Sequence, residues 1–246
     1  MKVLRIFGAI ISTLLVMLIA LYMYYLYTPK LNVPDLPGSF QQHNMEVAGL
    51  NRNFFSYRPV NLPLNAPVVF VLHGSTQTAS DMRQSVAFEF ESLADHFGFI
   101  VVYPNGFHKH WNDCRGSADY RANTENVDDI AFFRAMIKFF SENDQADPNA
   151  IFVTGYSNGG HMAYKLAMET PELIKAIAPI AANMPVDSNL DCNKMGVAVS
   201  VAILNGRNDP INPYEGGSVD ILGNTSRGTV LSTDASINYW LALEGT

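Results

Sequence analysis

A serine stands between two glycines in the segment Gly155-Tyr156-Ser157-Asn158-Gly159, directly after the apolar residues 150–154 and before a helical pattern. The two glycines allow the backbone to turn sharply at the end of a strand, so that the Ser157 hydroxyl is exposed and able to attack a carbonyl carbon. The N–H of Asn158 would then face the oxyanion that forms in this attack. A plain strand-to-helix turn can have the same sequence, and the neighbouring segments decide between the two interpretations.

A second segment whose residues could take part in catalysis lies upstream. The apolar residues 67–72 predict a buried strand, which runs directly into His73-Gly74-Ser75-Thr76. A loop in this position can present a backbone N–H, that of Ser75, toward the same oxyanion. For His73 we expect a bracing role, in which the imidazole holds the loop by hydrogen bonds, rather than a role as the base.

A third segment provides a candidate acid. Residues 197–204 form another apolar run and predict a strand, and Asn205-Gly206-Arg207-Asn208-Asp209-Pro210 follows it. Asp209 would orient a histidine and stabilise its positive charge in the transition state. The same residues also form turns for local reasons, since Asp and Pro are common turn residues. The position of Asp209 after the strand favours the catalytic interpretation.

The three segments and the blocks between them resemble the secreted polyhydroxybutyrate depolymerase, feruloyl esterase and acetyl-xylan esterase group of α/β hydrolases, from about residue 45 to the end. This resemblance implies an α/β-hydrolase fold with a mainly parallel sheet and helices on both faces. It also implies hydrolysis of carboxylic esters, in a polyester or in acylated polysaccharide, by a serine nucleophile without a metal or an organic cofactor. The blocks that carry the resemblance are 71–74, 98–106, 111–113, 127–133, 153–164, 177–181 and 209–217.

The sequence departs from the family pattern in its histidines. None of the six follows Asp209, although the pattern requires a base after the acid. His161 would lie one turn beyond the nucleophile and is expected to pack beside the turn instead of acting as the base. We therefore expect a chain truncated at its C-terminus, without the last strand and helix of the fold. The six histidines are His43, His73, His96, His108, His110 and His161.

The N-terminus predicts a membrane segment. Lys2 and Arg5 precede an uncharged apolar run, residues 6–27, which is long enough as a helix to cross the hydrocarbon core of a bilayer. We expect an uncleaved anchor with an extracytoplasmic catalytic domain, and a cleaved signal peptide with a secreted product is the alternative. The expected organisation is a membrane anchor or signal over residues 1–30, a Pro-rich linker over 31–40, and an incomplete hydrolase domain over 41–246.

Strand and helix patterns alternate through the hydrolase domain, as in a parallel sheet with crossover helices. The net charge of −7 argues against nucleic acid as a partner. Cys114 and Cys192 are bonded to each other or one of them remains free. Two other functions stay open: a non-catalytic membrane-anchored binding protein and a serine peptidase. The expected elements are a hairpin within 45–57, strands at 67–72, 99–103, 150–155, 175–181 and 197–204, and helices at 80–97, 127–141, 158–169 and 233–243.

Overall fold

The computed structural model describes residues 2–25, 27 and 31–243. The chain divides into two compact units, residues 1–33 and 34–246. The helix α1 (Lys2–Tyr25) makes up most of the first unit. Its segment Phe7–Tyr25 is exposed, and by length and composition it could cross a membrane, a criterion that N-terminal signal sequences also meet.

A seven-stranded sheet forms the centre of the second unit, in the order β1-β2-β4-β3-β5-β6-β7. The pairs from β4 through β7 are parallel, while β1, β2 and β4 pair in antiparallel fashion. The mainly parallel sheet predicted from the sequence is therefore confirmed. The strands are β1 (Ser39–Val47), β2 (Leu50–Arg58), β3 (Val68–Leu72), β4 (Ile100–Pro104), β5 (Ile151–Tyr156), β6 (Ile174–Ile180) and β7 (Ser200–Val201), and a separate ribbon pairs β8 (Gly217–Ser218) with β9 (Thr229–Val230).

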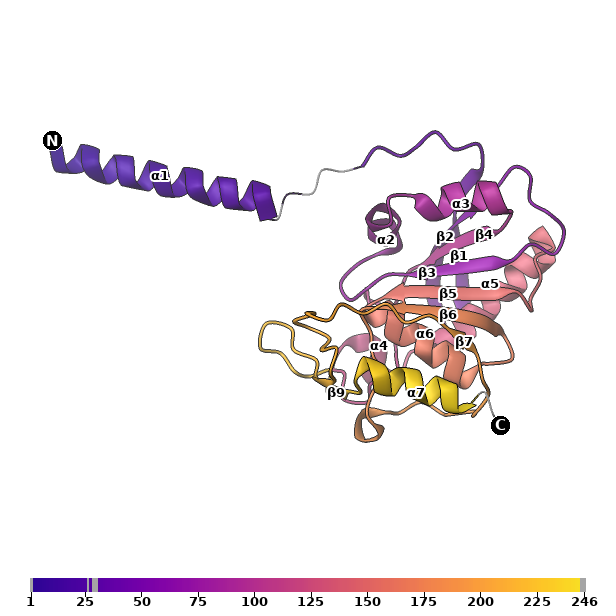
Figure 1. The fold of residues 1–246 in the computed structure, drawn as a ribbon. Coiled ribbons are helices and arrows are strands. Elements are labelled where there is room, and N and C mark those ends of the chain that lie inside the picture. Colours follow the sequence, from indigo (N-terminus) through magenta and orange to yellow (C-terminus); the bar gives the residue numbers. More distant parts are fainter. Residues whose placement is uncertain (1, 26, 28–30, 244–246) are drawn as a thin grey trace. The chain divides into compact units, whose positions relative to one another are not determined.

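Helices cover both faces of this sheet, as predicted (Figure 1). Successive residues of β3 point to opposite faces of the sheet. Phe70 packs in the core beneath α5 and α6, whereas Val71 packs in the core beneath α2 and α3. Trp240 of α7 stacks on Tyr164 of α6 with ring centroids 6.2 Å apart. The helices are α2 (Ala79–Ser85), α3 (Glu89–Phe97), α4 (Arg121–Thr124), α5 (Asp129–Asp144), α6 (Asn158–Glu169) and α7 (Thr233–Leu243).

Two predicted elements differ from the structure. The single helix expected at 80–97 is two helices, because Ala87 and Phe88 have φ angles of 51° and 61° and break the helical path between them. The strand expected at 197–204 is wrong in extent, since only Ser200–Val201 forms regular strand and Leu204 adds an isolated bridge to Ile180. Within the described residues β7 ends the sheet, and pairing on one side alone imposes regular geometry only weakly.

Candidate active site

Ser157 occupies the junction between β5 and α6 in a conformation that few non-glycine residues adopt. Its φ and ψ angles are 53° and −114°. The Ser157 N–H donates to the carbonyl of Ile180 at 2.8 Å, and the Ser157 carbonyl accepts from the His161 N–H at 2.9 Å. The side chain is half-buried, and its Oγ has no hydrogen-bond partner within residues 31–243. The backbone is thus fixed on both sides while the hydroxyl stays free.

The glycines on either side of Ser157 are required by packing. A Cβ at Gly159 would lie 2.6 Å from the carbonyl oxygen of Leu72 and 2.7 Å from that of His73. A Cβ at Gly155 would collide with the Gly159 carbonyl. These contacts are with backbone atoms, which cannot rotate away as side chains can. The start of α6 therefore packs directly against the end of β3, as only glycine allows.

The loop after β3 leaves the sheet at the same edge as Ser157, and the N–H of Ser75 in this loop is free. The N–H of Gly74 donates to Gln77 Oε1 at 2.9 Å, that of Thr76 to the Lys109 carbonyl at 3.0 Å, and that of Gln77 to the Gly74 carbonyl at 3.3 Å. The N–H of Ser75 has no acceptor in the described part of the chain. The loop thus leaves one donor, Ser75, available to a ligand.

This loop lies against the Ser157 turn. Leu72 pairs with Gly155 in the parallel register of β3 and β5. A Cβ built on Gly74 would lie 3.0 Å from Tyr156 Cδ1 and 3.4 Å from the Tyr156 carbonyl oxygen. Asn158 is the first residue of α6, where the N–H has no partner inside the helix. Two unengaged donors, on Ser75 and Asn158, therefore belong to adjoining segments at this edge.

His73 braces the loop, as predicted. The Gly106 N–H donates to His73 Nε2 at 2.9 Å, so the ring proton resides on Nδ1, which donates to the Gly74 carbonyl at 2.7 Å. Trp111 Nε1 donates to the His73 carbonyl at 3.0 Å. Burial lowers the pKa of His73 to about 4, which keeps the imidazole neutral at pH 7. Both ring nitrogens are engaged, and neither is available to Ser157.

The side chain of Asn158 is held by a buried polar cluster that sequence reasoning missed. Its Oδ1 accepts from the Trp111 N–H at 2.8 Å, and its Nδ2 donates to Asp113 Oδ2 at 2.6 Å. The same Asp113 oxygen accepts from Tyr120 Oη at 2.7 Å and from an Arg115 terminal nitrogen at 2.6 Å. This cluster fixes the residue whose N–H stands beside Ser157.

Asp113 is ionised within this cluster. Burial by itself would raise the pKa of the carboxyl, but the charge and hydrogen bonds of Arg115 hold that pKa well below its ordinary value. A signal for the cluster was present in the sequence, because Asp113 ends a block that carries the family resemblance, and Cys114 and Arg115 follow it directly. Spacing along the chain does not indicate that their partner is Asn158.

The cysteine between these two residues forms a disulfide. Cys114 and Cys192 are bonded, with their Cα atoms 5.0 Å apart, so the alternative of a free cysteine is wrong. The Asp191 N–H donates to the Cys114 carbonyl at 3.1 Å. The disulfide thus attaches the polar cluster to the segment that follows β6.

Asp209 lies in a loop that leaves the same edge of the sheet. Leu204 bridges to Ile180, whose carbonyl also accepts from the Ser157 N–H. Asp209 Oδ1 accepts from the N–H groups of Ile211 and Asn212 at 2.8 and 2.9 Å. The side chain is half-buried, and Oδ2 has no hydrogen-bond partner in the described residues. One carboxylate oxygen is therefore fixed by the turn and the other is available.

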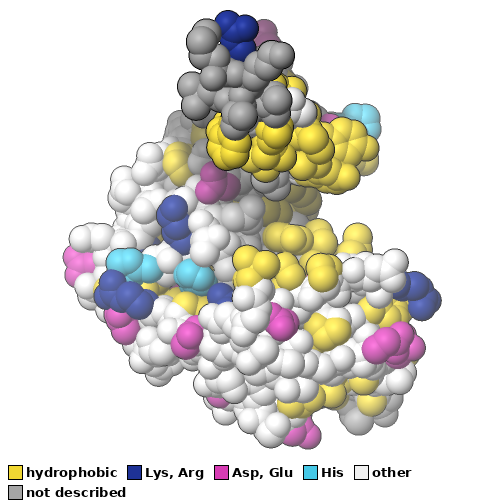
Figure 2. Space-filling model, turned by 90° about the vertical axis from the view of Figure 1, so that its left-hand side faces the viewer, with side chains coloured by type: hydrophobic (Ala, Val, Ile, Leu, Met, Phe, Trp, Pro, Cys, Tyr) yellow, Lys and Arg dark blue, Asp and Glu magenta, His cyan; other side chains and the backbone are white. Residues whose placement is uncertain are grey.

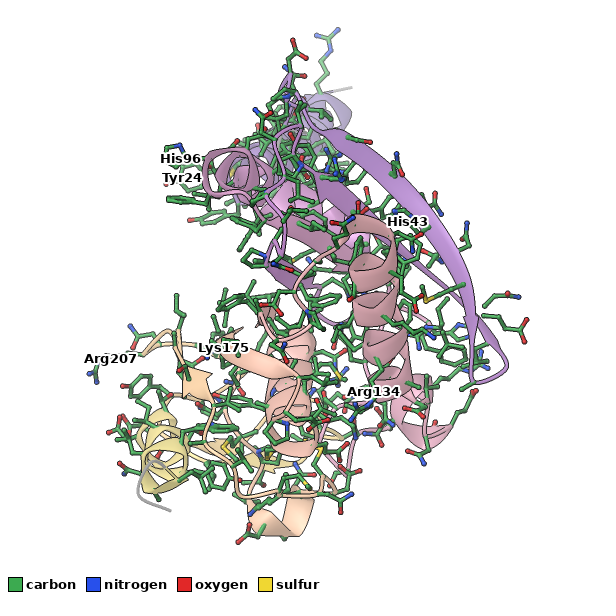
Figure 3. All side chains as sticks on the ribbon, turned by 90° about the vertical axis from the view of Figure 1, so that its right-hand side faces the viewer. Tyr24, His43, His96, Arg134, Lys175 and Arg207 are labelled. Atoms are coloured by element: carbon green, nitrogen blue, oxygen red, sulfur yellow. A yellow bond between two sulfur atoms is a disulfide. The ribbon has the colours of Figure 1, made fainter. Side chains whose placement is uncertain are left out.

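None of the six histidines, all of which the structure describes, hydrogen-bonds to Asp209. His161 is buried with its Nδ1 unpartnered, and burial lowers its pKa to about 3. His108 contacts Arg121 at 2.8 Å. His43 lies on β1 and packs against Phe139 of α5, and His96 lies on α3 (Figure 3). The structure brings Ser157, Asn158, Ser75 and the Asp209 loop to one edge, without a histidine between serine and acid.

A large apolar groove lies elsewhere on the sheet. Its volume is about 420 Å³, and its lining includes Val69, Phe90, Phe152, Ala176 and Val201. These residues come from α3 and from the middle of the strands, on the face that carries α3. The groove is therefore separate from the strand ends at which Ser157 lies.

Known proteins are similar to this chain in sequence and in fold. The family described as Esterase PHB depolymerase matches residues 54–221. Poly(3-hydroxyalkanoate) depolymerase C of Paucimonas lemoignei is 31% identical over 132 residues, which are 53% of this chain and 31% of that protein. The acetylxylan esterase of Coprinopsis cinerea is 29% identical over 172 residues, 69% of this chain and 41% of that protein.

The chain thus spans less than half the length of these two relatives. Among solved structures, a thermostable esterase superimposes with a TM-score of 0.54 at 21% identity, over 72% of this chain and 48% of that one. This likeness supports the α/β-hydrolase fold. Because the family match covers well over half of the 246 residues, the assignment does not depend on a single motif. The chain belongs to the esterase PHB depolymerase family.

Proposed function

We propose that the protein is a serine esterase, a carboxylic-ester hydrolase in which Ser157 is the nucleophile. The observation that carries this proposal is the strained Ser157 backbone at the end of β5, with a free Oγ beside the unengaged N–H groups of Ser75 and Asn158. A strained serine turn of this kind costs free energy, and a pure binding protein gains nothing from it. The geometry therefore favours catalysis over simple binding.

In the proposed reaction, a base takes the Ser157 proton as Oγ attacks the ester carbonyl carbon, and it gives this proton to the alcohol that leaves from the tetrahedral intermediate. The N–H groups of Ser75 and Asn158 donate to the oxyanion of this intermediate. Water then attacks the acyl-enzyme and releases the acid. Asp209 orients the base through its free Oδ2. We assign the base to none of the six histidines, because none contacts Asp209.

The substrate class follows from the relatives. One is named a poly(3-hydroxyalkanoate) depolymerase and another an acetylxylan esterase. Both names describe esters of a polymer, in its backbone in the first case and in its acyl decoration in the second. We propose that this protein likewise acts on a polyester or on acyl esters of a polysaccharide.

The proposed location is extracytoplasmic. Disulfides persist in oxidising compartments, and the bonded pair Cys114–Cys192 fits export of the hydrolase unit. The apolar segment Phe7–Tyr25 then serves as a membrane anchor, or as a signal if it is cleaved. Residues 1–30 are proposed as this segment, 31–40 as the linker and 41–246 as hydrolase domain.

The test is covalent labelling of the full-length protein by an activated fluorophosphonate, followed by peptide mapping. We expect the label on Ser157, and Ser157→Ala should abolish both this labelling and the extra hydrolysis of p-nitrophenyl butyrate that added imidazole gives the wild-type protein. Ser92→Ala, at an exposed position on α3, is the matched control and should leave both unchanged. Labelling of another residue, or an equal acceleration by imidazole in wild type and Ser157→Ala, would refute the assignment.

A further inference from the structure

Arg227 is a half-buried cation without a carboxylate partner. Its Nε is buried and makes no hydrogen bond, and within the described residues its guanidinium forms no ion pair. Arg52 and Arg115, the two fully buried arginines, each contact an aspartate, at 2.7 and 2.6 Å. An uncompensated charge away from water is unfavourable, and an anion bound there would relieve it.

Arg227 lies close to the proposed oxyanion donors. Its guanidinium carbon is 5.8 Å from the ring centroid of Tyr120, and Tyr120 Oη is 3.3 Å from Asn158 Nδ2. His110 stacks on the same tyrosine, with ring centroids 4.7 Å apart. The contacts Arg227–Tyr120–Asn158 therefore connect the free guanidinium to the residue that follows Ser157.

A second unpaired cation belongs to the same area. Lys109 is exposed, and it has no carboxylate within ion-pair distance in the described part of the chain. Its carbonyl accepts from the Thr76 N–H at 3.0 Å, which ties Lys109 to the loop that presents Ser75. Lys109 and Arg227 are thus both tied to segments that adjoin Ser157, Lys109 through the Ser75 loop and Arg227 through Tyr120.

Two acidic groups around Tyr120 are already paired with other arginines. Asp113 is bound by Arg115, and Glu125 is paired with Arg121. Neither of these two carboxylates is available to pair with Arg227 or Lys109. Burial chiefly lowers the pKa of His110, and the charge of Arg227 lowers it further. Figure 2 shows histidine and Lys or Arg side chains on one side of a face, with Asp and Glu side chains among them and a hydrophobic area next to them.

We propose that Arg227 and Lys109 form a carboxylate-binding subsite beside Ser157. The planar guanidinium can donate two parallel N–H bonds to a carboxylate, and the ammonium adds a point charge. The substrate class is then an ester with a free carboxylate a few bonds from the scissile carbonyl, as at the acid end of a hydroxy-acid oligomer. This inference rests on the proposed esterase function, because it places the carboxylate relative to the Ser157 nucleophile.

The kinetic test uses the full-length protein and two esters with acyl groups of similar length. p-Nitrophenyl butyrate is neutral, and the p-nitrophenyl hemiester of succinate carries a carboxylate at the far end. We expect the wild-type protein to have a higher kcat/KM for the succinyl ester, with a preference that falls as salt is added. Arg227→Gln should lower the ratio of the two kcat/KM values roughly ten-fold, and Arg227→Lys should retain part of it.

Lys109→Gln should lower the same ratio by a smaller factor, because Lys109 is exposed and its charge is screened. The matched control is Lys175→Gln, which removes an unpaired lysine at the start of β6, at the opposite end of the strand from Ser157. It should leave the ratio unchanged. A wild-type ratio that does not favour the succinyl ester, or a ratio unaffected by Arg227→Gln, would overturn the subsite.

A binding test separates this inference from the esterase proposal. Monomethyl succinate is titrated into the protein while the His110 ring signals are followed by NMR. We expect saturable shifts in the wild-type and Ser157→Ala proteins, and none with Arg227→Gln. If neither ester is hydrolysed but these shifts occur, the esterase proposal fails and the subsite stands. If the shifts are missing or persist in Arg227→Gln, the subsite is refuted.

Discussion

At the scale of single residues, Asn158 takes part in two arrangements through its backbone and its side chain. Its backbone N–H stands beside Ser157, while its side chain is hydrogen-bonded to Trp111 and Asp113 at 2.8 and 2.6 Å. An oxyanion donor is effective only when it is held in place before the reaction. In the proposed reaction, the buried Asp113–Arg115 pair therefore acts as a positioning group, which orients the Asn158 donor without touching substrate.

Loss of the Asp113 carboxylate should destabilise the hydrolase unit. Asp113→Ala leaves the buried Arg115 charge uncompensated, and we expect a loss of about 3–5 kcal/mol in the free energy of unfolding. Glu172→Ala is the control, because it breaks the exposed Arg134–Glu172 pair and should cost about 1 kcal/mol or less. Denaturant unfolding of both variants measures the difference. Equal losses would contradict a buried, uncompensated charge.

The lowered pKa of His73 leads to a prediction of how the stability of the protein depends on pH. Its pKa is about 4 in the folded protein and near 6.5 when exposed, so the unfolded chain binds the proton more readily. The neutral ring contributes stability above pH 6.5, and this contribution, about 3 kcal/mol, is lost as the pH falls toward 4. Unfolding measured between pH 7 and 4 should show the loss, with a smaller slope in His73→Asn. An unchanged slope would exclude His73 as its source.

The sequence predicted the candidate site residues but not the side-chain contacts that hold them. Ser157, Asn158, Ser75 and Asp209 were identified because each follows a predicted strand, and their catalytic roles remain predictions. The contacts of Asn158 with Asp113 and Tyr120 were not predicted, since they join side chains 45 and 38 positions apart. Local patterns do not report which buried polar groups meet across a fold.

At the scale of elements, long patterns predicted well and irregular junctions did not. The helices α6 and α7 lie at 158–169 and 233–243, as predicted, because each pattern continues for three turns. The break at Ala87 and Phe88 was missed, since neither residue type signals a positive φ. The strand at 197–204 was overestimated because hydrophobicity alone does not supply a hydrogen-bonding neighbour.

The close approach of α6 to β3 yields a prediction for this element pair. Gly159→Ala places a methyl group 2.6 Å from the Leu72 carbonyl oxygen, and the backbone must shift to accept it. We expect a loss of about 1–3 kcal/mol in stability and much slower phosphonate labelling. Gly206→Ala is the control, because a Cβ there meets no atom within 4 Å. Thermal unfolding measures both, and equal midpoints would contradict the packing argument.

At the scale of the whole molecule, the proposed chemistry is spread over segments that only the sheet brings together. The Ser75 loop follows β3, Ser157 follows β5, and the Asp209 loop follows the short β7. The Cys114–Cys192 bond adds a covalent link between the polar cluster and the segment after β6. Parallel strands with adjacent carboxyl ends thus assemble the site, and side chains from the connecting loops complete it.

The lack of contact between Asp209 and any of the six histidines leads to the last prediction. Every histidine of this chain is either engaged, as His73 is, or out of contact with Asp209, as His161 is. The 246-residue chain should therefore hydrolyse p-nitrophenyl acetate slowly, at about 10³–10⁴-fold over water, from the oxyanion donors and binding alone. Added imidazole should accelerate the wild-type chain more than Ser157→Ala, since it can accept the Ser157 proton. Rates typical of an intact serine esterase without imidazole would show that one of the six histidines serves as the base.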